Sequence, residues 1–324
     1  MLEVRVPGLH ATIQDAGRPG AAAYGIPPSG ACDPLALAAA NLLLGNDPAA
    51  PALEMELLGA ELIVREPCLV AVAGAEMEAV IPEDGRRIRP GTSHLLRGGS
   101  TLVFGAARDG ARTYLALAGG IDLPRVLGSA STAPVGGIGG IGGRPVAAGD
   151  LLRPADPDRL DGAGRHWPGP GPASGVAGHA GPRTIHVLEG PHAADLPRDA
   201  LRLLLSTAWT VTPRSDRAGL RLAGPPLPPA SGPEPASFGM TWGAIQVPAG
   251  GAPILLLADH PTVGGYRVIA VAASADRPAL GQVQAGDELR FARIDLATAL
   301  RLAADADAEL AAAGARLRMA EPMA

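Results

Sequence analysis

Two short apolar runs, separated by two charged residues and a proline, make up the segment Leu62-Ile63-Val64-Arg65-Glu66-Pro67-Cys68-Leu69-Val70-Ala71-Val72-Ala73. Apolar runs of this length, bounded by turn-forming or charged residues, predict β-strands. The same pattern recurs at residues 101–104, at 113–117 and at the start of the chain, 1–6. We therefore expect a mainly β fold in which many short strands are joined by tight turns.

The composition agrees with this expectation. The chain has 324 residues, of which 44 are glycine and 33 are proline, and both residue types favour turns. A chain of this length exceeds one typical hydrophobic core, which predicts two domains.

Three segments show helical patterns. The clearest is 34–44, where Asp33 is a good N-cap, Pro34 suits the first helical position and Gly45 suits the position after the end. A second helix is expected at 198–205. A third, rich in alanine and leucine, is expected from 296 to about 317.

A weak internal repeat indicates two related halves. The segments Val146-Ala-Ala-Gly-Asp-Leu-Leu-Arg153 and Val283-Gln-Ala-Gly-Asp-Glu-Leu-Arg290 agree at six of eight positions. A stretch rich in glycine, proline, alanine and serine lies between them and is typical of a linker or long surface loop. We expect an N-terminal half at 1–160, a linker or loop at 161–182, a C-terminal half at 183–295, and a helix and tail at 296–324.

Charge and targeting patterns exclude several classes of protein. The formal net charge is 27 − 32 = −5, whereas a nucleic-acid partner requires a basic surface. No apolar run approaches the roughly 20 residues that span a bilayer. The N-terminal segment has neither a charged leader nor an apolar core. We expect a cytoplasmic protein with neither nucleic acid nor membrane as a partner.

All 27 basic residues are arginine, because the chain contains no lysine. A phosphate-binding loop of the Walker A type and a Schiff-base mechanism both need a lysine, and so does an amidase of the Ser–Ser–Lys type. These chemistries are excluded for this chain.

A first group of polar residues follows the N-terminal strands. It begins with Gln14-Asp15-Ala16-Gly17-Arg18 and continues, within an otherwise apolar stretch, with Tyr24, Ser29, Asp33 and Asn41. Polar loop residues on a β scaffold are often functional. The alternative is a simple turn in which Asp15 pairs with Arg18, an exposed pair that contributes about 0–1 kcal/mol.

A second group lies in the C-terminal half. Its members are Ser215, Asp216, Arg217, Arg221, Gln246, Asp259, Gly264, Gly265 and Tyr266. Arginine is planar and always charged, so it suits the recognition of carboxylate or phosphate. The alternative is an Asp216–Arg clamp that only holds this half together. Asp259 and His260 are adjacent, and neighbouring strand residues point to opposite faces, so we do not expect a catalytic dyad.

The segment Gly137-Ile138-Gly139-Gly140-Ile141-Gly142 matches the dinucleotide-binding pattern letter for letter. That motif requires a strand before it and a helix after it. Pro134 and Pro145 flank the segment instead, which favours a flexible turn or a backbone nest for an anion.

These motifs and their order resemble the family of the 5-oxoprolinase C subunit. The family is also described as allophanate hydrolase subunit 2 or biotin-dependent carboxyltransferase, and it includes KipA-like regulators. The resemblance extends from about Val4 to Phe291. It implies tandem cyclophilin-like β-barrel halves with a few covering α-helices. This sequence differs from the family pattern at Pro261-Thr262-Val263, where many relatives have Gln-Thr-Thr, and at Arg267, where many have proline.

The resemblance also implies a function and its partners. The chain would be the C subunit of an ATP-dependent 5-oxoprolinase and inactive alone. It would work with two partners, a KipI-like B subunit plus a separate A subunit, on a small amide substrate. Asp15, Arg18, Asp216 and Arg217 are the candidate catalytic residues, and the other members of the two polar groups are candidates for binding substrate or ATP with Mg²⁺. The metal ligands stay unknown.

Two other functions remain open under the same resemblance. One is the carboxyltransferase half of a urea-carboxylase-like enzyme, which would bind carboxybiotin instead of ATP. The other is a KipA-like regulatory protein that acts on a KipI-like partner. In each case we expect the two polar groups to line one cleft, with Glu54 behind it as a buried support whose charge needs a partner. We also expect Arg18 and Arg217 to be replaceable by alanine without loss of stability.

Overall fold

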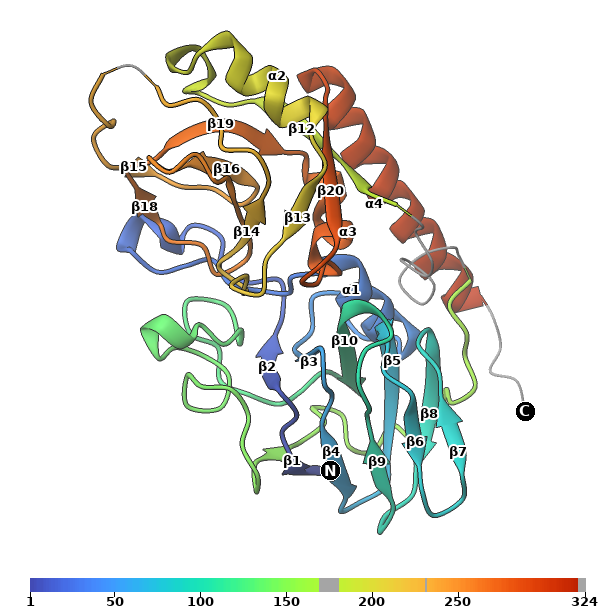
Figure 1. Cartoon of the computed structure of the whole chain (residues 1–324). Helices are drawn as coiled ribbons and strands as arrows, with labels where there is room; N and C mark the ends of the chain where they lie inside the picture. Colours follow the sequence, from blue (N-terminus) through green and yellow to red (C-terminus); the bar gives the residue numbers. More distant parts are fainter. Residues whose placement is uncertain (169–180, 231, 320–324) are drawn as a thin grey trace. The chain divides into compact units, whose positions relative to one another are not determined.

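The computed structural model describes residues 1–168, 181–230 and 232–319, and it is mainly β, as predicted (Figure 1). The chain forms two compact units. The first contains residues 1–18, 29–168 and 309–319, and the second contains residues 19–28 and 181–308. The segment 19–28 thus leaves the first unit and belongs to the second, whereas the sequence placed it in the N-terminal half.

The first unit contains two sheets. The five-stranded sheet has the order β2-β3-β10-β5-β8 and the six-stranded sheet the order β11-β1-β4-β9-β6-β7. Their strands are β1 (Leu2–Val6), β2 (His10–Gln14), β3 (Ala52–Glu56), β4 (Glu61–Val64), β5 (Cys68–Glu76), β6 (Ala79–Ile81), β7 (Arg86–Ile88), β8 (Thr92–Leu96), β9 (Thr101–Val103), β10 (Asp109–Leu117) and β11 (Leu151–Leu152). All five N-terminal strands expected from the sequence are present. The pairing leaves two open sheets in place of the expected barrel.

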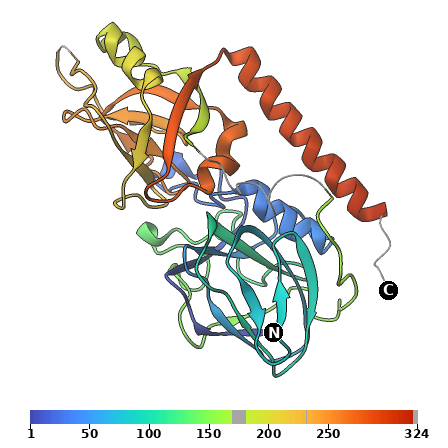
Figure 2. The same cartoon turned by 45° about the vertical axis from the view of Figure 1, so that its right-hand side comes forward.

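Alternating side chains bury the five-stranded sheet on both faces. Val70 and Val72 on β5 join the core that the two sheets share, together with Leu2 and Leu62. The intervening residues of β5 face the opposite way and pack with the helix α1 (Pro34–Leu43), which covers the other face of the five-stranded sheet (Figures 1 and 2). This alternation follows from the two-residue period of a strand.

The helix α1 begins and ends as its sequence predicts. The Asp33 carboxylate accepts a hydrogen bond from the Ala36 amide at 2.9 Å, and Pro34 occupies the first position. Gly45 follows the end of the helix with a left-handed φ of 71°, a conformation that glycine adopts without steric cost.

The second unit contains a closed barrel with the order β12-β19-β16-β17-β14-β13-β20. Its strands are β12 (Arg183–Glu189), β13 (Trp209–Val211), β14 (Gly219–Ala223), β16 (Ala244–Val247), β17 (Ile254–Leu256), β19 (Arg267–Ala272) and β20 (Glu288–Arg293), and a separate pair is formed by β15 (Phe238–Gly239) and β18 (Val263–Gly264). β12 and β20 run parallel and close the barrel around a core that includes Trp209 and Phe291. The expected barrel is confirmed in this half.

The other helices match the sequence closely. α2 (Arg198–Ser206) and α4 (Leu296–Met319) lie where they were expected. α3 (Arg277–Gly281) was not predicted, because five residues are too short to show helical periodicity. Short 3-10 turns occur at Ala21–Tyr24, Pro134–Gly136, Ala193–Asp195 and Ser274–Asp276. No described helix is both long enough and apolar enough to cross a membrane.

The internal repeat corresponds to the same turn in both units. Gly149 and Gly286 have φ values of 89° and 94°. Each following aspartate accepts a hydrogen bond from the amide three residues before it, at 2.7 Å for Asp150 and 3.2 Å for Asp287. β11 and β20 begin directly after these turns. The repeat therefore reflects a shared turn-to-strand geometry.

Part of the predicted linker belongs to the first unit. The Ser93 amide of β8 donates to the Arg165 carbonyl at 3.0 Å, and the Gly164 amide donates back to Ser93 at 2.9 Å. Residues 162–167 therefore extend the edge of the five-stranded sheet. Residues 169–180, the rest of the glycine- and proline-rich stretch, lie outside the described residues.

The glycine-rich segment has no strand before it and no helix after it, so the dinucleotide interpretation is excluded. It packs instead against residues 130–133, where the Gly140 amide donates to the Ala130 carbonyl at 2.8 Å. Gly139 has a φ of 71°, and a Cβ atom there would lie 2.0 Å from the Ser131 carbonyl oxygen. Gly142 has a similar φ of 66°, but no heavy atom lies within 4 Å of its Cβ position.

This pair of glycines generates a stability prediction. Gly142→Ala should lower the free energy of unfolding by about 1 kcal/mol, the cost of the left-handed backbone alone. Gly139→Ala should cost roughly 2 kcal/mol more, because a fixed carbonyl oxygen occupies the space of the new methyl group. Urea unfolding of both variants measures the difference. Equal losses would show that residues 137–142 do not pack as described.

Candidate functional site

The Asp15 carboxylate is buried and accepts hydrogen bonds from four donors. They are the Gly17 amide at 2.7 Å, the Ser129 hydroxyl at 2.6 Å, the Ala130 amide at 2.7 Å and the Ser131 hydroxyl at 2.5 Å. The Asp15 amide also donates to the Ser131 hydroxyl at 2.9 Å. Hydrogen bonds to an ionised group are the strong ones in proteins. Asp15 therefore fixes the loop 14–18 to the segment 129–132, more than a hundred residues away.

Arg18 strengthens the same connection. Its side chain is buried, and its guanidinium donates to the carbonyl oxygen of Ser131 and, at 3.5 Å, to that of Val126. The sequence predicted that Arg18 and Arg217 could be replaced by alanine without loss of stability, but both side chains are buried. Replacing either by alanine is therefore expected to lower stability, because buried partners would lose their hydrogen bonds.

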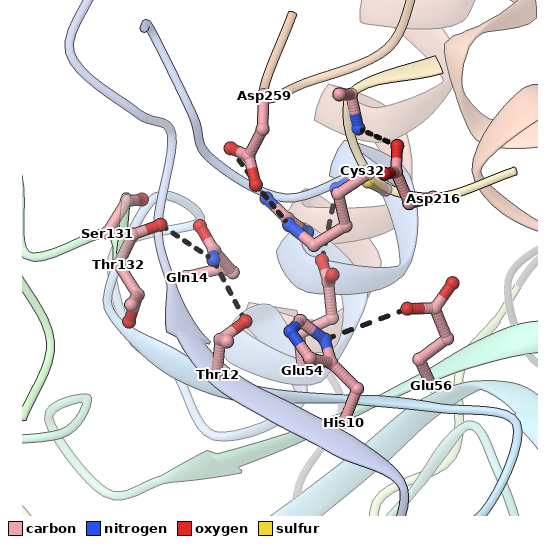
Figure 3. A network of polar contacts seen from close by, with 12 residues as sticks. His10, Thr12, Gln14, Cys32, Glu54, Glu56, Ser131, Thr132, Asp216 and Asp259 are labelled. Carbon is pink, nitrogen blue, oxygen red and sulfur yellow. Dashed lines mark hydrogen bonds and ion pairs between the residues drawn. The ribbon is translucent and has the colours of Figure 1, made fainter. Parts of the chain in front are cut away.

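Gln14 and Ser29 belong to two segments that are joined at Asp15. The Gln14 side-chain amide donates to the Thr12 hydroxyl at 2.9 Å and to the Thr132 carbonyl at 3.2 Å (Figure 3). Ser29 has a left-handed φ of 53° and is buried. The Ala31 amide, two residues further, donates to the Asp15 carbonyl at 3.0 Å. Loop 14–18 and residues 29–31 thus form one corner of the first unit.

Three other candidates of the first group have different positions. Asp33 caps α1, and its own amide donates to the Tyr114 hydroxyl at 2.9 Å. The Asn41 side chain is fully buried, donating to the Ala50 carbonyl at 2.8 Å and accepting from Asn46 at 2.9 Å. These contacts give Asp33 and Asn41 structural roles in the first unit. Tyr24 is 79% exposed and belongs to the second unit, because the chain leaves the first unit after Arg18.

Glu54 is buried and has the partners that its charge requires, as predicted. Its carboxylate accepts from the Cys32 amide at 3.0 Å (Figure 3). It also accepts from the Tyr114 hydroxyl at 2.6 Å, and the Arg112 guanidinium lies 3.7 Å away. Burial, followed by the nearby charge of Glu54, raises the pKa of Tyr114 well above its ordinary value. Tyr114 therefore stays protonated and able to donate.

These residues form cross-strand rows that were not predicted from the sequence. Thr12, Glu54 and Tyr114 are register partners on β2, β3 and β10, and so are His10, Glu56 and Arg112. Side chains directly opposite on neighbouring strands lie on one face of the sheet. A signal was present, since polar residues occupy every second position of β2 (His10, Thr12, Gln14), β3 (Glu54, Glu56) and β10 (Arg112, Tyr114).

The candidates in the second unit are centred on an ion pair. The Arg217 guanidinium donates to Asp259 through Nε at 2.8 Å and through one terminal nitrogen at 3.4 Å, and both side chains are largely buried. The structural alternative considered from the sequence paired an arginine with Asp216. The Asp216 side chain instead accepts from the amides of Ala218 and Gly219 at 2.8 and 3.2 Å. These contacts shape the turn into β14.

The remaining candidates of the second unit lie in a turn, in the barrel wall or at the surface. The Ser215 hydroxyl accepts from the Arg221 amide at 2.9 Å, and the Arg221 side chain is exposed on β14, between buried leucines as predicted. Gln246 is buried on β16 and donates to the Met240 sulfur at 3.2 Å. Gly264 lies beside it, since a Cβ there would be 3.0 Å from the Gln246 amide nitrogen. Gly265 and the exposed Tyr266 follow.

His260 is buried and donates from Nδ1 to the Pro261 carbonyl at 2.9 Å. Burial lowers the pKa of His260 below its ordinary value, so the ring is neutral at pH 7. Among the residues that the structure describes, no three His, Cys, Asp or Glu side chains come together as a metal site requires.

Comparisons with known proteins give consistent matches. The family model described as carboxyltransferase domain, subdomain A and B, matches residues 24–293. The 5-oxoprolinase C subunit of Escherichia coli is 36% identical over 94% of this chain and 95% of that protein. The urea amidolyase of Saccharomyces cerevisiae is 32% identical over 90% of this chain but only 16% of that enzyme.

A solved structure shows the same fold. The crystal structure of the K. lactis urea amidolyase aligns with a TM-score of 0.84 and 28% identity, over 95% of this chain and 20% of that chain. The chain thus spans nearly all of the bacterial protein and a small part of the urea amidolyases.

The buried ion pair generates a prediction that separates two neighbouring acids. Asp259→Ala should lower the free energy of unfolding by about 3 kcal/mol, because it removes one partner of a buried pair. Asp216→Ala, which removes only hydrogen bonds of an exposed turn, should cost about 1 kcal/mol. Chemical denaturation monitored by tryptophan fluorescence measures both. A larger loss for Asp216→Ala would contradict the assigned pairing.

Proposed function

The chain belongs to the family of carboxyltransferase domains with subdomains A and B, and we propose that it is the C subunit of an ATP-dependent 5-oxoprolinase. In this role it helps to open the lactam ring of 5-oxoproline to glutamate. The observation that carries the proposal is the match to the C subunit of a 5-oxoprolinase, which extends along nearly the full length of both chains.

The reaction sets clear chemical requirements. An unactivated lactam resists water, and phosphorylation of its oxygen makes the carbonyl carbon electrophilic. A site for that step needs positive charge near the phosphates and donors for the developing charge. Arg221 is the candidate for phosphate contact, because its guanidinium is exposed, whereas Arg18 and Arg217 are held in buried contacts.

The proposed ATP site does not need a cluster of protein ligands to bind Mg²⁺. Magnesium in ATP-dependent sites keeps several waters and is held by phosphates with one or two carboxylates. Asp216 presents a carboxylate at the surface of the turn that leads to Arg221. We assign it to the bound magnesium, in place of the catalytic role expected from the sequence.

The chain is proposed to work only with partners. The described polar groups are acids, arginines and amides, and they include no nucleophile activated by a neighbouring base of the kind that covalent catalysis uses. We assign completion of the site to a KipI-like B subunit, and the complex has the A subunit of the enzyme as a further member.

The second candidate is a carboxyltransferase function on urea or a related amide. The structural likeness to urea amidolyase supports it. Carboxybiotin would then take the place of ATP, and the candidate site residues would bind biotin and an amide acceptor.

One experiment tests the proposal. The purified chain, each of the partner A and B subunits, and the combined complex are assayed separately for glutamate formation from 5-oxoproline and ATP. We expect turnover in the complex and none in the chain alone, with no effect of avidin. Turnover by the chain alone contradicts partner dependence. Inhibition by avidin, with carboxylation of an amide acceptor, supports the second candidate instead.

A further inference from the structure

Two exposed turns flank the buried segment 129–132. Residues 124–128 come before this segment and residues 134–137 come after it, and every residue of both stretches is exposed. Three apolar side chains of these turns reach water, namely those of Val126 (41% exposed), Leu127 (54%) and Val135 (90%). Single apolar residues on a surface are common, whereas a group of them marks an interaction site. We call residues 124–128 and 134–137 the apolar turns.

The first of the apolar turns holds Leu127 in a backbone conformation that leucine disfavours. Val126 and Ser129 form an antiparallel bridge, so the turn between them has two residues, Leu127 with a φ of 53° and Gly128 with a φ of 82°. A two-residue turn with positive φ at both positions favours Asn-Gly, because a bulky side chain is crowded there. Strain of this kind persists where function needs it. The exposed leucine therefore indicates that its apolar side chain is used.

Buried polar contacts hold the base of both turns in place. The Asp15 carboxylate accepts three hydrogen bonds from the segment 129–132, and the Arg18 guanidinium donates to the Val126 carbonyl at 3.5 Å. The Thr132 amide donates to β2 at 2.8 Å, and Figure 1 shows the turns in green beside this strand. Only four residues separate Ser129 from Ala133, so the bases of the turns lie at most about 14 Å apart. The two turns thus belong to one preorganised surface, which loses little conformational entropy on binding.

The charge of this surface favours a different protein over a second copy of the chain. Arg125, which is exposed, is the only charged residue between positions 123 and 138. In a two-fold symmetric dimer the same patch of each copy meets, which would bring two Arg125 side chains of like charge together. A partner that offers an apolar groove with a carboxylate at its rim would instead pair with Arg125.

We propose that the apolar turns dock into an apolar groove of the B subunit, with Arg125 facing a carboxylate at the rim of that groove. This inference rests on the proposed function for the identity of the partner. The B subunit is chosen over the A subunit because it is the one assigned to complete the candidate site. The turns emerge from the segment 129–132, which the candidate residue Asp15 binds.

The test measures binding of the purified B subunit to the full chain by calorimetry. The wild-type chain is compared with Leu127→Asn, Val135→Ser and Leu9→Asn. Leu9→Asn is the matched control, because Leu9 is another exposed leucine of the first unit, 64% exposed and outside the apolar turns. Thermal unfolding of each variant is measured alongside.

We expect Leu127→Asn and Val135→Ser to weaken binding by about tenfold or more, as for residues at the centre of an interface, and Leu9→Asn to bind as wild type does. The melting temperature of Leu127→Asn should stay the same or rise, because asparagine tolerates the left-handed conformation. If it falls instead, Val135→Ser decides, since its side chain is almost fully exposed. Wild-type affinity in both turn variants overturns the inference.

Arg125→Glu tests the charge of the partner. It should weaken binding of the B subunit by about tenfold at low salt, because two like charges then face each other across the interface. The loss should shrink as salt is raised, since exposed charges are screened. Unchanged or tighter binding by Arg125→Glu overturns the assigned carboxylate.

Glutamate formation from 5-oxoproline and ATP, measured while the complex is titrated with B subunit, separates this inference from the proposed function. Leu127→Asn should need about tenfold more B subunit for half-maximal turnover and reach the same maximum. Leu127-dependent binding of the B subunit without any turnover rejects the 5-oxoprolinase assignment and keeps the docking surface. Turnover with an unchanged requirement for B subunit rejects the docking surface and keeps the function.

The other occupants of this surface are outcomes of the same measurements. Leu127-dependent binding of the A subunit in place of the B subunit overturns the choice of partner. Leu127-dependent self-association of the chain, measured by sedimentation, overturns it in favour of a second copy. Absence of any binding to the B subunit overturns the inference as well.

Discussion

The buried carboxylate of Asp15 is the interaction on which the candidate site of the first unit depends. Its four donors come from loop 14–18 and from the segment 129–132. A charge buried in this way is tolerated because hydrogen bonds replace its hydration. The carboxylate therefore specifies where the two segments meet. Gln14 is placed by this meeting, since its nitrogen reaches the Thr132 carbonyl.

The five-stranded sheet of the first unit carries a cross-strand row of polar side chains. Glu54, Tyr114 and Arg112 are buried on one face of β3 and β10, and each has a charged or hydrogen-bonding partner. Buried polar networks of this kind are stable only when their members are satisfied. The contacts of Glu54 with Tyr114 and Arg112 therefore hold β3 and β10 in register.

Local features of the fold could be predicted from the sequence, and non-local ones could not. The cap at Asp33 and the three longer helices depend on neighbouring residues, and the strands on short alternating patterns. The pairing of Arg217 with Asp259 instead of Asp216, the burial of Arg18 and the cross-strand row of Glu54 and Tyr114 depend on register and on contacts between distant segments. Tyr24 was placed wrongly because nothing in the local sequence shows that the chain changes unit after Arg18. Gln14 was identified from the sequence as a candidate site residue, but its contact with the Thr132 carbonyl joins segments more than a hundred residues apart and could not be predicted.

Amide hydrogen exchange of Asp15→Asn tests most directly the claim that this carboxylate organises the site. The substitution keeps the shape of the side chain and removes its charge. The account predicts that exchange at Gly17 and Ala130, whose amides donate to Asp15, accelerates by about tenfold or more, while amides in the centres of β5 and β10 keep their protection. Unchanged exchange at Gly17 and Ala130 would contradict the account, because the segments would then be held together without the carboxylate.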